Sequence, residues 1–507
     1  EGVLLNKAQT TLIQVPSGRT GAYEIPNSAT GIGDSAFAGC RLLTQVTMGG
    51  NVASIGGGAF SNCTGLSEIA LGAGVTSVGS YAFSNCTGLE QVTIGPLVTT
   101  IGSSAFSGCD NLQAFNVSTT NPSFSSLGGL LYNKTQTNFI QCPGGFTGAV
   151  TVSSGVTTID TNAFSLSRNL TAIHVDPANS AFSSINGILF NKTQTNIIRC
   201  PMGKSGTVQI SAGVTSISYS AFFGCRQVAA FEVDLNNPAY RSLDGVLYNK
   251  AGTTLLNCPL GKSGAVTLSA IVTGITDGAL GGCIFLTAIH VDPANPVYAS
   301  VDGVLFNKSL SHLIQYPGGK TGYAIIPASV ISLAYAFDGR DNLAGLVFLG
   351  NAPSSTYYSF DTSVPVQHFE GAIGFSSSTW SSWTVIDMGV QSPIKLWLLT
   401  NAFPYDTNMS SDMNGDGVSL LMAYALNLNP RGNLASSMPQ PGLSGGYLTI
   451  TYYAAKAGIT YRVETSGDLK TWTTQGVSIS PQNANGYRTA SVPATDAGRY
   501  IRLAVSE

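Results

Sequence analysis

The chain has 507 residues, a net charge of −3 and only 10% charged residues, with 43% hydrophobic residues and 59 glycines. Such a low charge argues against electrostatic binding to nucleic acid or to an anionic membrane. The apolar content excludes a charge-rich disordered chain, and no apolar run approaches the roughly 18 residues that a transmembrane helix needs.

The first third of the chain repeats with a period of 23 residues. Each unit carries an Ala-Phe pair, followed three residues after the Phe by Cys and six residues after it by Leu. The pairs are Ala36-Phe37, Ala59-Phe60, Ala82-Phe83 and Ala105-Phe106. Apolar residues two positions apart close each unit, which predicts a short strand with one face turned inward.

After Phe106 the period becomes 58 residues, which is one 23-residue unit plus an insert of 35. The inserts contain GLLYNK at 129–134, GILFNK at 187–192, GVLYNK at 245–250 and GVLFNK at 303–308, and a further copy, GVLLNK, lies at 2–7. In each insert a polar Asn-Lys turn separates two apolar runs, which predicts a β-hairpin. Because a coil of this size buries its apolar side only against its neighbours, the repeats predict a stacked β-solenoid over residues 1–346.

The nine cysteines occupy only two repeat positions, so stacking should place them in interior columns. Free cysteine behaves as a small buried hydrophobe, and side chains stacked in register point the same way. Buried thiols are therefore the favoured interpretation, with some disulfides or metal binding as the alternatives.

The segments IGGGAFSNCTGLSEIALGAGVTS, VGSYAFSNCTGLEQVTIG and FSSINGILFNKTQTNIIRCPMGKSG resemble the BspA-like leucine-rich repeat. The resemblance covers about residues 1–350. It implies a right-handed, β-rich solenoid on a secreted or surface-attached bacterial protein with a binding or scaffolding role. It does not identify a ligand.

Residues 347–388 lose the repeat but keep scattered aromatic residues, and we expect them to cap the solenoid. These residues are Phe348, Tyr357, Tyr358, Phe369, Phe375, Trp380 and Trp383. Residues 389–433 read as a linker, and residues 434–507 contain alternating strands that predict a small antiparallel β-sandwich. The stretch YRVETSGDLKTW resembles C-terminal modules of bacterial exoproteins, which leaves carbohydrate binding, secretion and spacing open as its role.

Within the linker, DMNGDG places Asp412, Asn414 and Asp416 at positions 1, 3 and 5 of a calcium loop, with a glycine at position 6. Position 12, which should be a bidentate Glu, is Ala423. The segment is similar to calcium-loop linkers of bacterial surface proteins without their strongest ligand. Weak calcium binding therefore competes with a second interpretation, in which Asp416 or Ser419 caps the following helix.

The sequence offers no catalytic constellation, because nucleophile motifs, phosphate-binding glycine loops and zinc motifs are missing from it. His174 and His290 share a repeat position, but they are two modules apart, and Glu232 stands between them. Asp176, Asp234 and Asp292 come two positions later. A local turn is the favoured role of these Asp residues, and a calcium column is the alternative. We therefore expect no enzymatic activity.

Lysines form two repeated sets in an otherwise uncharged chain. Lys134, Lys192, Lys250 and Lys308 are expected at hairpin tips, and Lys204, Lys262 and Lys320 follow the Pro-x-Gly turns. Stacking would turn both sets into rows. These rows could serve solubility and edge protection, or they could bind an acidic polymer or a negatively charged partner.

The sequence as a whole predicts a secreted or cell-surface, non-enzymatic repeat protein that displays an extended solenoid surface. The expected partner is an extracellular protein or polysaccharide, and nucleic acid is not expected. The alternative is a self-associating subunit of an extracellular layer, sheath or filament. Calcium is the one cofactor that the sequence suggests.

Overall fold

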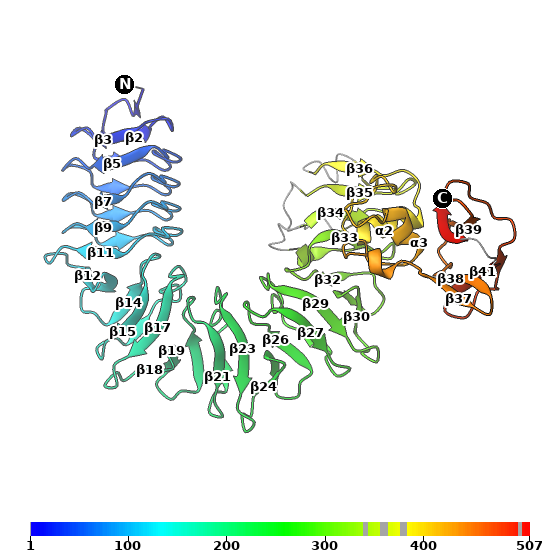
Figure 1. Ribbon diagram of the computed structural model, residues 1–507. Helices are drawn as coiled ribbons and strands as arrows, with labels where there is room; N and C mark the ends of the chain where they lie inside the picture. Colours follow the sequence, from blue (N-terminus) through cyan, green and yellow to red (C-terminus); the bar gives the residue numbers. More distant parts are fainter. Residues whose placement is uncertain (1, 338–342, 355–363, 376–382, 495–498) are drawn as a thin grey trace. The chain divides into compact units, whose positions relative to one another are not determined.

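A computed structural model describes residues 2–337, 343–354, 364–375, 383–494 and 499–507. The chain divides into two compact units, Glu1–Val297 and Tyr298–Glu507. Both are built mainly from β-strands (Figure 1). Tyr357, Tyr358 and Trp380 of the expected cap lie outside the described residues.

The first part of unit 1 is a stack of short coils, each with two strands on different sides of the coil. One parallel sheet joins β2 (Thr11–Gln14), β4 (Gly31–Ile32), β6 (Ser54–Ile55), β8 (Ser77–Val78) and β10 (Thr100–Ile101), and β1 (Leu4–Leu5) pairs with β2 in the antiparallel direction. On the other side, β3 (Gly21–Glu24) pairs with β5 (Leu43–Thr47), and β7 (Glu68–Ala70), β9 (Gln91–Ile94) and β11 (Ala114–Val117) form a second sheet. Ser54 lies opposite Ser77, 23 residues later, so the predicted coil length is confirmed.

Each 58-residue module contains two coils, because the insert supplies a coil of its own as well as a hairpin. In the first module, β12 (Phe124–Leu127), β13 (Leu130–Asn133) and β14 (Asn138–Gln141) pair in antiparallel fashion. Strand β14 then pairs in parallel with β16 (Thr158–Ile159), and β15 (Gly148–Val152) pairs in parallel with β17 (Leu170–Val175). The predicted hairpin across the Asn-Lys turn is confirmed as β13–β14.

The next two modules of unit 1 repeat this pattern strand for strand. The second contains β18 (Phe182–Ile185), β19 (Ile188–Asn191), β20 (Asn196–Arg199), β21 (Gly206–Ile210), β22 (Ser216–Ile217) and β23 (Val228–Val233). The third contains β24 (Tyr240–Leu243), β25 (Val246–Asn249), β26 (Thr254–Asn257), β27 (Gly264–Leu268), β28 (Gly274–Ile275) and β29 (Leu286–Val291). The two strands before the Asn-Lys turn are joined by Asn186-Gly187 or Asp244-Gly245, all with positive φ, as a two-residue I′ hairpin turn requires.

The phenylalanines of the short coils form a continuous column inside the solenoid. Phe37, Phe60, Phe83 and Phe106 are at most 1% exposed. Successive rings are stacked with centroids 4.6, 5.0 and 5.4 Å apart. The predicted interior position of this column is confirmed.

All nine cysteines are free and buried, as the favoured interpretation predicts. In the short coils each thiol lies against the backbone of the preceding coil, as in Cys86, whose Sγ lies 3.1 Å from the carbonyl oxygen of Phe60. Ser167 takes the cysteine position in one coil and donates to the carbonyl oxygen of Pro143 at 3.0 Å. The position therefore selects a small side chain that can donate to a neighbouring coil.

Unit 2 begins with the antiparallel strands β30 (Tyr298–Val301), β31 (Val304–Asn307) and β32 (Leu313–Gln315). The 3-10 helix η1 (Ala334–Phe337) follows β33. A four-stranded parallel sheet joins β33 (Gly322–Ile326), β34 (Leu343–Phe348), β35 (Val366–His368) and β36 (Val385–Asp387). The region expected to be a cap thus contributes two parallel strands to this sheet.

Helix α2 (Pro393–Thr400) packs on the outer side of this sheet. Its Leu396 and Leu399 share an apolar cluster with Val347, Phe369 and Met388. Ser392 caps the helix by accepting a hydrogen bond from the Lys395 amide. The segment expected as a linker is therefore partly packed against strands.

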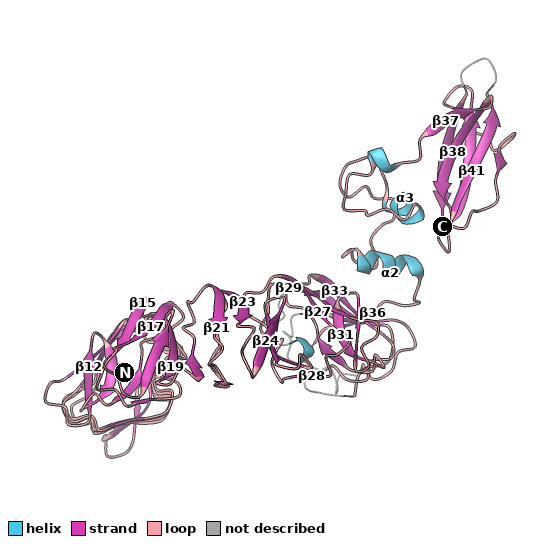
Figure 2. Ribbon diagram, turned by 90° about the horizontal axis from the view of Figure 1, so that it is seen from below, coloured by secondary structure: helices cyan, strands magenta, loops and turns pink. Residues whose placement is uncertain are grey.

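The C-terminal module consists of two antiparallel sheets (Figure 2). One contains β37 (Pro441–Ser444), β38 (Tyr447–Tyr453), β41 (Tyr487–Pro493) and β40 (Ser478–Ile479), and the other contains β39 (Thr460–Ser466) and β42 (Tyr500–Ser506). Both sheets, together with Leu426 after α3 (Leu420–Ala425), contribute to one apolar cluster. The 3-10 helix η2 (Ala435–Ser437) leads into β37. The predicted small antiparallel β-domain is confirmed.

Candidate binding surfaces

The lysines at the hairpin tips hold a turn of their own module. The Nζ atoms of Lys134, Lys192 and Lys250 each donate to the backbone carbonyl 15 residues earlier, at 2.9, 3.2 and 3.0 Å. Lys308 occupies the same repeat position in unit 2. All four side chains are exposed, so their outer parts remain in contact with solvent.

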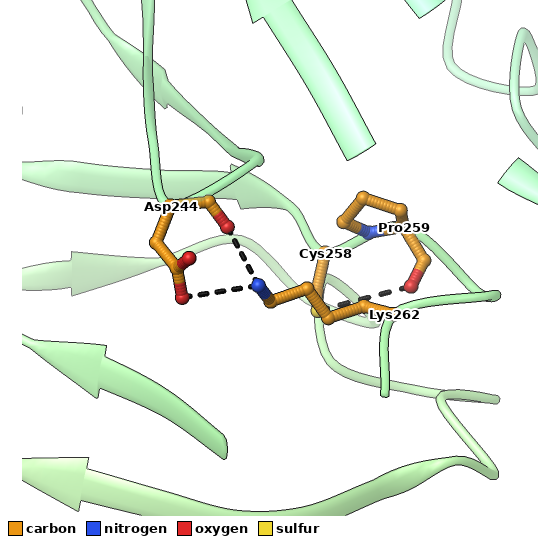
Figure 3. A network of polar contacts seen from close by, with 4 residues as sticks. All are labelled: Asp244, Cys258, Pro259 and Lys262. Atoms are coloured by element: carbon orange, nitrogen blue, oxygen red, sulfur yellow. Dashed lines mark hydrogen bonds and ion pairs between the residues drawn. The ribbon is translucent and has the colours of Figure 1, made fainter. Parts of the chain in front are cut away.

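The second set of lysines stabilises the I′ hairpin turn through hydrogen bonds. Lys204, Lys262 and Lys320 donate to the carbonyl oxygen of the residue 18 positions earlier, at 2.8, 2.8 and 2.9 Å. Lys262 also pairs with the Asp244 carboxylate at 3.0 Å, and only 13% of its side chain is exposed (Figure 3). Lys320 makes the equivalent pair with Asp302 at 2.8 Å.

The first module has neither the lysine nor a carboxylate at its hairpin turn. Its hairpin turn is Gly128-Gly129, which offers no carboxylate, and Phe146 stands where the other modules have lysine. The amino groups of this second set thus serve the hairpin turn, a role that neither sequence interpretation anticipated.

The three aspartates of the repeated turn have the local role that the sequence favours. Oδ1 of Asp176, Asp234 and Asp292 accepts a hydrogen bond at 2.8 Å from the amide two residues later. This is an Asx turn. Within the described residues, no three His, Cys, Asp or Glu side chains gather closely enough to hold a metal ion.

A column of fully buried asparagines follows these turns, and sequence reasoning missed it. Asn121, Asn179 and Asn237 are 0% exposed. In Asn179, Nδ2 donates to the carbonyl oxygens of Ser153 and Val156 at 2.7 and 2.8 Å, and Oδ1 accepts from two amides of its own turn. Each amide group therefore ties one coil to the preceding one. The available signal was that an asparagine recurs just before the first strand of each insert, a place also held by Asn295.

The exposed face of the longer strands forms a surface that recurs from coil to coil. We call it the outer ladder, and in the short coils it consists of Gln45, Thr47, Glu68, Ala70, Gln91 and Thr93, all exposed. The parallel register places equivalent residues side by side, as with Gln91 beside Glu68. In the modules, Thr151 and His174, Gln209 and Glu232, and Thr267 and His290 hold matching places.

In the second module the outer ladder borders a hollow of about 530 Å³. Its lining includes apolar Ile185 and Phe190 together with Glu232 and Asp234. Gln209 Nε2 donates to Glu232 Oε2 at 2.7 Å, so one carboxylate already has a neutral partner. The hollow suits an amphipathic group better than a metal ion.

The carboxylate oxygen atoms of the Asp412 loop already accept hydrogen bonds from nearby groups of the chain. Asp412 accepts hydrogen bonds from the amides of Gly415, Asp416 and Gly417 at 2.9, 3.2 and 2.7 Å. Asp416 accepts from two further amides, and these bonds hold the pKa of its carboxyl below the usual range. Asn414 Nδ2 donates to Asp416 Oδ2 at 3.0 Å.

Ser419 caps α3 by accepting from the Met422 amide, which confirms the capping interpretation for this residue. Ala423, at position 12 of the loop, is buried and has no oxygen to offer through its side chain. A cation would therefore have to compete with backbone amides for the carboxylates of Asp412 and Asp416.

Residues 20–135 and 139–236 match six copies of the BspA type leucine rich repeat region. No curated protein matches the sequence. None of the helices in the described part of the chain is long and apolar enough to span a membrane. The insert pattern continues beyond the matched region in β24–β29 of unit 1 and in β30–β32 of unit 2.

Several solved structures are similar to this chain. The pneumococcal vaccine antigen PcpA is 13% identical, with 75% of this chain and 83% of that chain covered and a TM-score of 0.34. A leucine rich cell surface protein from Faecalibacterium prausnitzii is 22% identical, with 80% and 96% covered and a TM-score of 0.34. A leucine-rich repeat protein from Eubacterium ventriosum is 16% identical, with 76% and 93% covered and a TM-score of 0.31.

Proposed function

We propose that this chain, which carries a BspA-type leucine-rich repeat region, is a secreted or cell-surface binding protein without enzymatic activity. The observation that carries the proposal is the outer ladder, an exposed surface whose side chains repeat in register from coil to coil. Such a surface can engage an extended partner at many points with little energy at each. The proposed partner is an extracellular protein or polysaccharide.

The lysine rows support a partner that is not selected by charge alone. The seven ligand-binding candidates named from the sequence are all lysines. Six of their amino groups, those of Lys134, Lys192, Lys250, Lys204, Lys262 and Lys320, already donate hydrogen bonds to backbone carbonyls of their own modules. An acidic polymer would have to compete with these bonds. The outer ladder, with its Thr, Gln and Ala side chains, is the better candidate for the contact surface.

A structural subunit of an extracellular layer, sheath or filament is the second candidate function. It would use the same surface, which is rich in uncharged side chains, for contacts between copies of this chain. Sedimentation of the full chain over a wide concentration range separates the two candidates, because a protein that stays monomeric at high concentration is not such a subunit.

Weak calcium binding at the Asp412 loop is a separate part of the proposal. Three oxygen-bearing side chains lie within five residues, which is the support for it, and the missing ligand at position 12 sets an affinity no tighter than about millimolar. Calorimetric titration of the full chain with calcium, compared with Asp412→Ala, tests it. Equal heats for both proteins would refute the site.

The binding function is tested with immobilised extracellular-matrix proteins and cell-wall polysaccharides. Thr93→Lys places a charge in the outer ladder, and Thr100→Lys places one on the other sheet of the same region; both threonines are exposed. We expect at least tenfold weaker binding for Thr93→Lys alone. Equal effects of both changes, or no binding by the unmodified chain, would contradict the proposal.

A further inference from the structure

We propose that one sheet face of the C-terminal module binds a neutral polysaccharide chain. The face consists of the odd-numbered residues of β38 (Tyr447–Tyr453) and of β41 (Tyr487–Pro493), and we call it the tyrosine–threonine face. The inference extends the proposed extracellular function to a second site that is separate from the solenoid.

The strand register gathers these residues on one side of the sheet. Thr449 lies opposite Ser491, Thr451 opposite Thr489, and Tyr453 opposite Tyr487. The even-numbered residues of the same strands include Ile450, Tyr452, Ala490 and Val492, all at most 3% exposed. The two strands therefore have one core face and one outward face, as strict alternation requires.

Tyrosines stand at both ends of the outward face. Tyr447 is 48% exposed at one end and Tyr487 is 44% exposed at the other. Six residues of extended strand separate Tyr447 from Tyr453, which is about 20 Å. Rings at this separation could each stack against a different sugar ring of one polysaccharide chain, because the C–H faces of sugars pack on aromatic rings.

The aromatic end formed by Tyr453 and Tyr487 is held in place by contacts between the two rings and with Gly486. The rings of Tyr453 and Tyr487 meet edge to face with centroids 5.5 Å apart. Gly486, at φ +85°, lies so close that a Cβ atom there would be 2.7 Å from Cε2 of Tyr453. A side chain at residue 486 would displace the ring, so this glycine permits the aromatic corner.

Between the tyrosines the face carries hydroxyl groups and no charge. The Oγ1 atoms of Thr451 and Thr489 lie 2.9 Å apart, and Thr449 Oγ1 donates to the carbonyl oxygen of Gly442 at 3.2 Å. Each hydroxyl both donates and accepts, so further hydrogen bonds to sugar hydroxyls remain available.

The chemistry of the face selects among the possible partners. An anionic polymer finds no cation on the face, and a protein interface would have an apolar centre with a polar rim. Here the aromatic rings lie at the ends and the hydroxyl groups lie in the centre. That order suits a neutral chain of sugars.

Affinity electrophoresis of the full chain in gels that contain neutral polysaccharides tests the inference. Cellulose derivatives, xylan, mannan and starch serve as probes, and alginate serves as the anionic comparison. We expect retardation by at least one neutral polymer, unchanged by added salt because no ion pair is involved. Tyr447→Ala with Tyr487→Ala should weaken this retardation at least tenfold.

Tyr500→Ala is the matched control, since Tyr500 is 42% exposed in the same module but lies on β42 of the other sheet. Tyr447→Phe with Tyr487→Phe should keep most of the binding, which separates ring stacking from loss of the fold. Equal weakening by Tyr500→Ala, retardation by alginate only, or no retardation by any neutral polymer would overturn the inference. Thr93→Lys should leave this retardation unchanged, so failure here and failure of the solenoid proposal are distinguishable.

Discussion

Replacing Phe83 by alanine removes the middle ring of the phenylalanine column and tests how the coils hold together. Phe83 is fully buried between Phe60 and Phe106, with ring centroids at 5.0 and 5.4 Å. Buried Phe→Ala changes cost about 3–5 kcal/mol. The upper part of this range applies because two ring pairs are lost, each of which adds about 0.5–1.5 kcal/mol beyond area burial.

In a solenoid this loss acts on one coil and its two interfaces rather than on the whole chain. About 4 kcal/mol corresponds to a roughly thousandfold rise in local opening, since every 1.4 kcal/mol is tenfold. Hydrogen exchange with mass spectrometry should therefore show lost protection in residues 75–110 and little change elsewhere. The measurement is made well below the denaturant midpoint, so that local opening is seen before global unfolding.

Phe223→Ala is the matched control for this experiment. Phe223 follows the equivalent phenylalanine of another coil but is 67% exposed, so its replacement should change stability by less than about 0.5 kcal/mol. Wild-type exchange around residue 83 in the Phe83→Ala protein would mean that the column does not hold adjacent coils together. Loss of protection spread evenly over the chain would mean that the coils do not open independently.

Three further predictions concern the thiols, the lysines and the acidic turns. The native protein should leave its cysteines unlabelled at pH 8, because all nine thiols are buried and burial raises the pKa of Cys142 to about 12. The unfolded chain should expose nine thiols to the same reagent. A native protein that labels fully would contradict the interior columns. Lys262→Ala should lower the urea midpoint by an amount that corresponds to about 1 kcal/mol of unfolding free energy. Lys250→Ala, which loses one exposed hydrogen bond to a carbonyl, should lower the midpoint less. The reverse order would refute the proposal that Lys262 stabilises the hairpin turn. Backbone amides, that of Thr471 foremost, hold the pKa of the Asp468 carboxyl well below its usual range, so its stabilising effect is present above about pH 4 and is lost as the pH falls further. Thermal unfolding from pH 6 down to pH 2.5 should show a smaller decline for Asp468→Asn than for the unmodified chain.

The repeat periods predicted the interior columns of the solenoid, where equivalent side chains of successive coils have the same environment. A fixed spacing of Phe, Cys and Leu requires that each side chain meets its own copy in the next coil, so the interior columns followed directly. The double coil of each module did not follow, because the sequence does not show that β14 pairs with β16, 20 residues later. The I′ turns were visible as Asn186-Gly187 and Asp244-Gly245, and attention to these dipeptides would have found the first hairpin.

The contacts of the lysine side chains were harder to predict, because their amino groups donate to backbone carbonyls. A lysine that donates to a carbonyl leaves no partner residue to find in the sequence, except where Asp244 adds its carboxylate. The packing of α2 did leave a signal. Ile325 and Val347 are apolar at strand positions where the modules of unit 1 carry residues such as Thr267 and His290, and a covered sheet face requires that change.

The outer ladder, rather than the lysine rows, is the surface to examine for function, because its side chains differ between modules. Side chains that stabilise the fold are held by their partners, as Lys262 is by its hairpin turn. Outer-ladder positions change their side chains while the strand register stays the same: the place held by His174 in one module is held by Glu232 in the next. A surface that can change its side chains without changing its backbone can be adapted to a partner coil by coil. Binding specificity in this protein should therefore reside in the residues that differ between modules, and stability in those that do not.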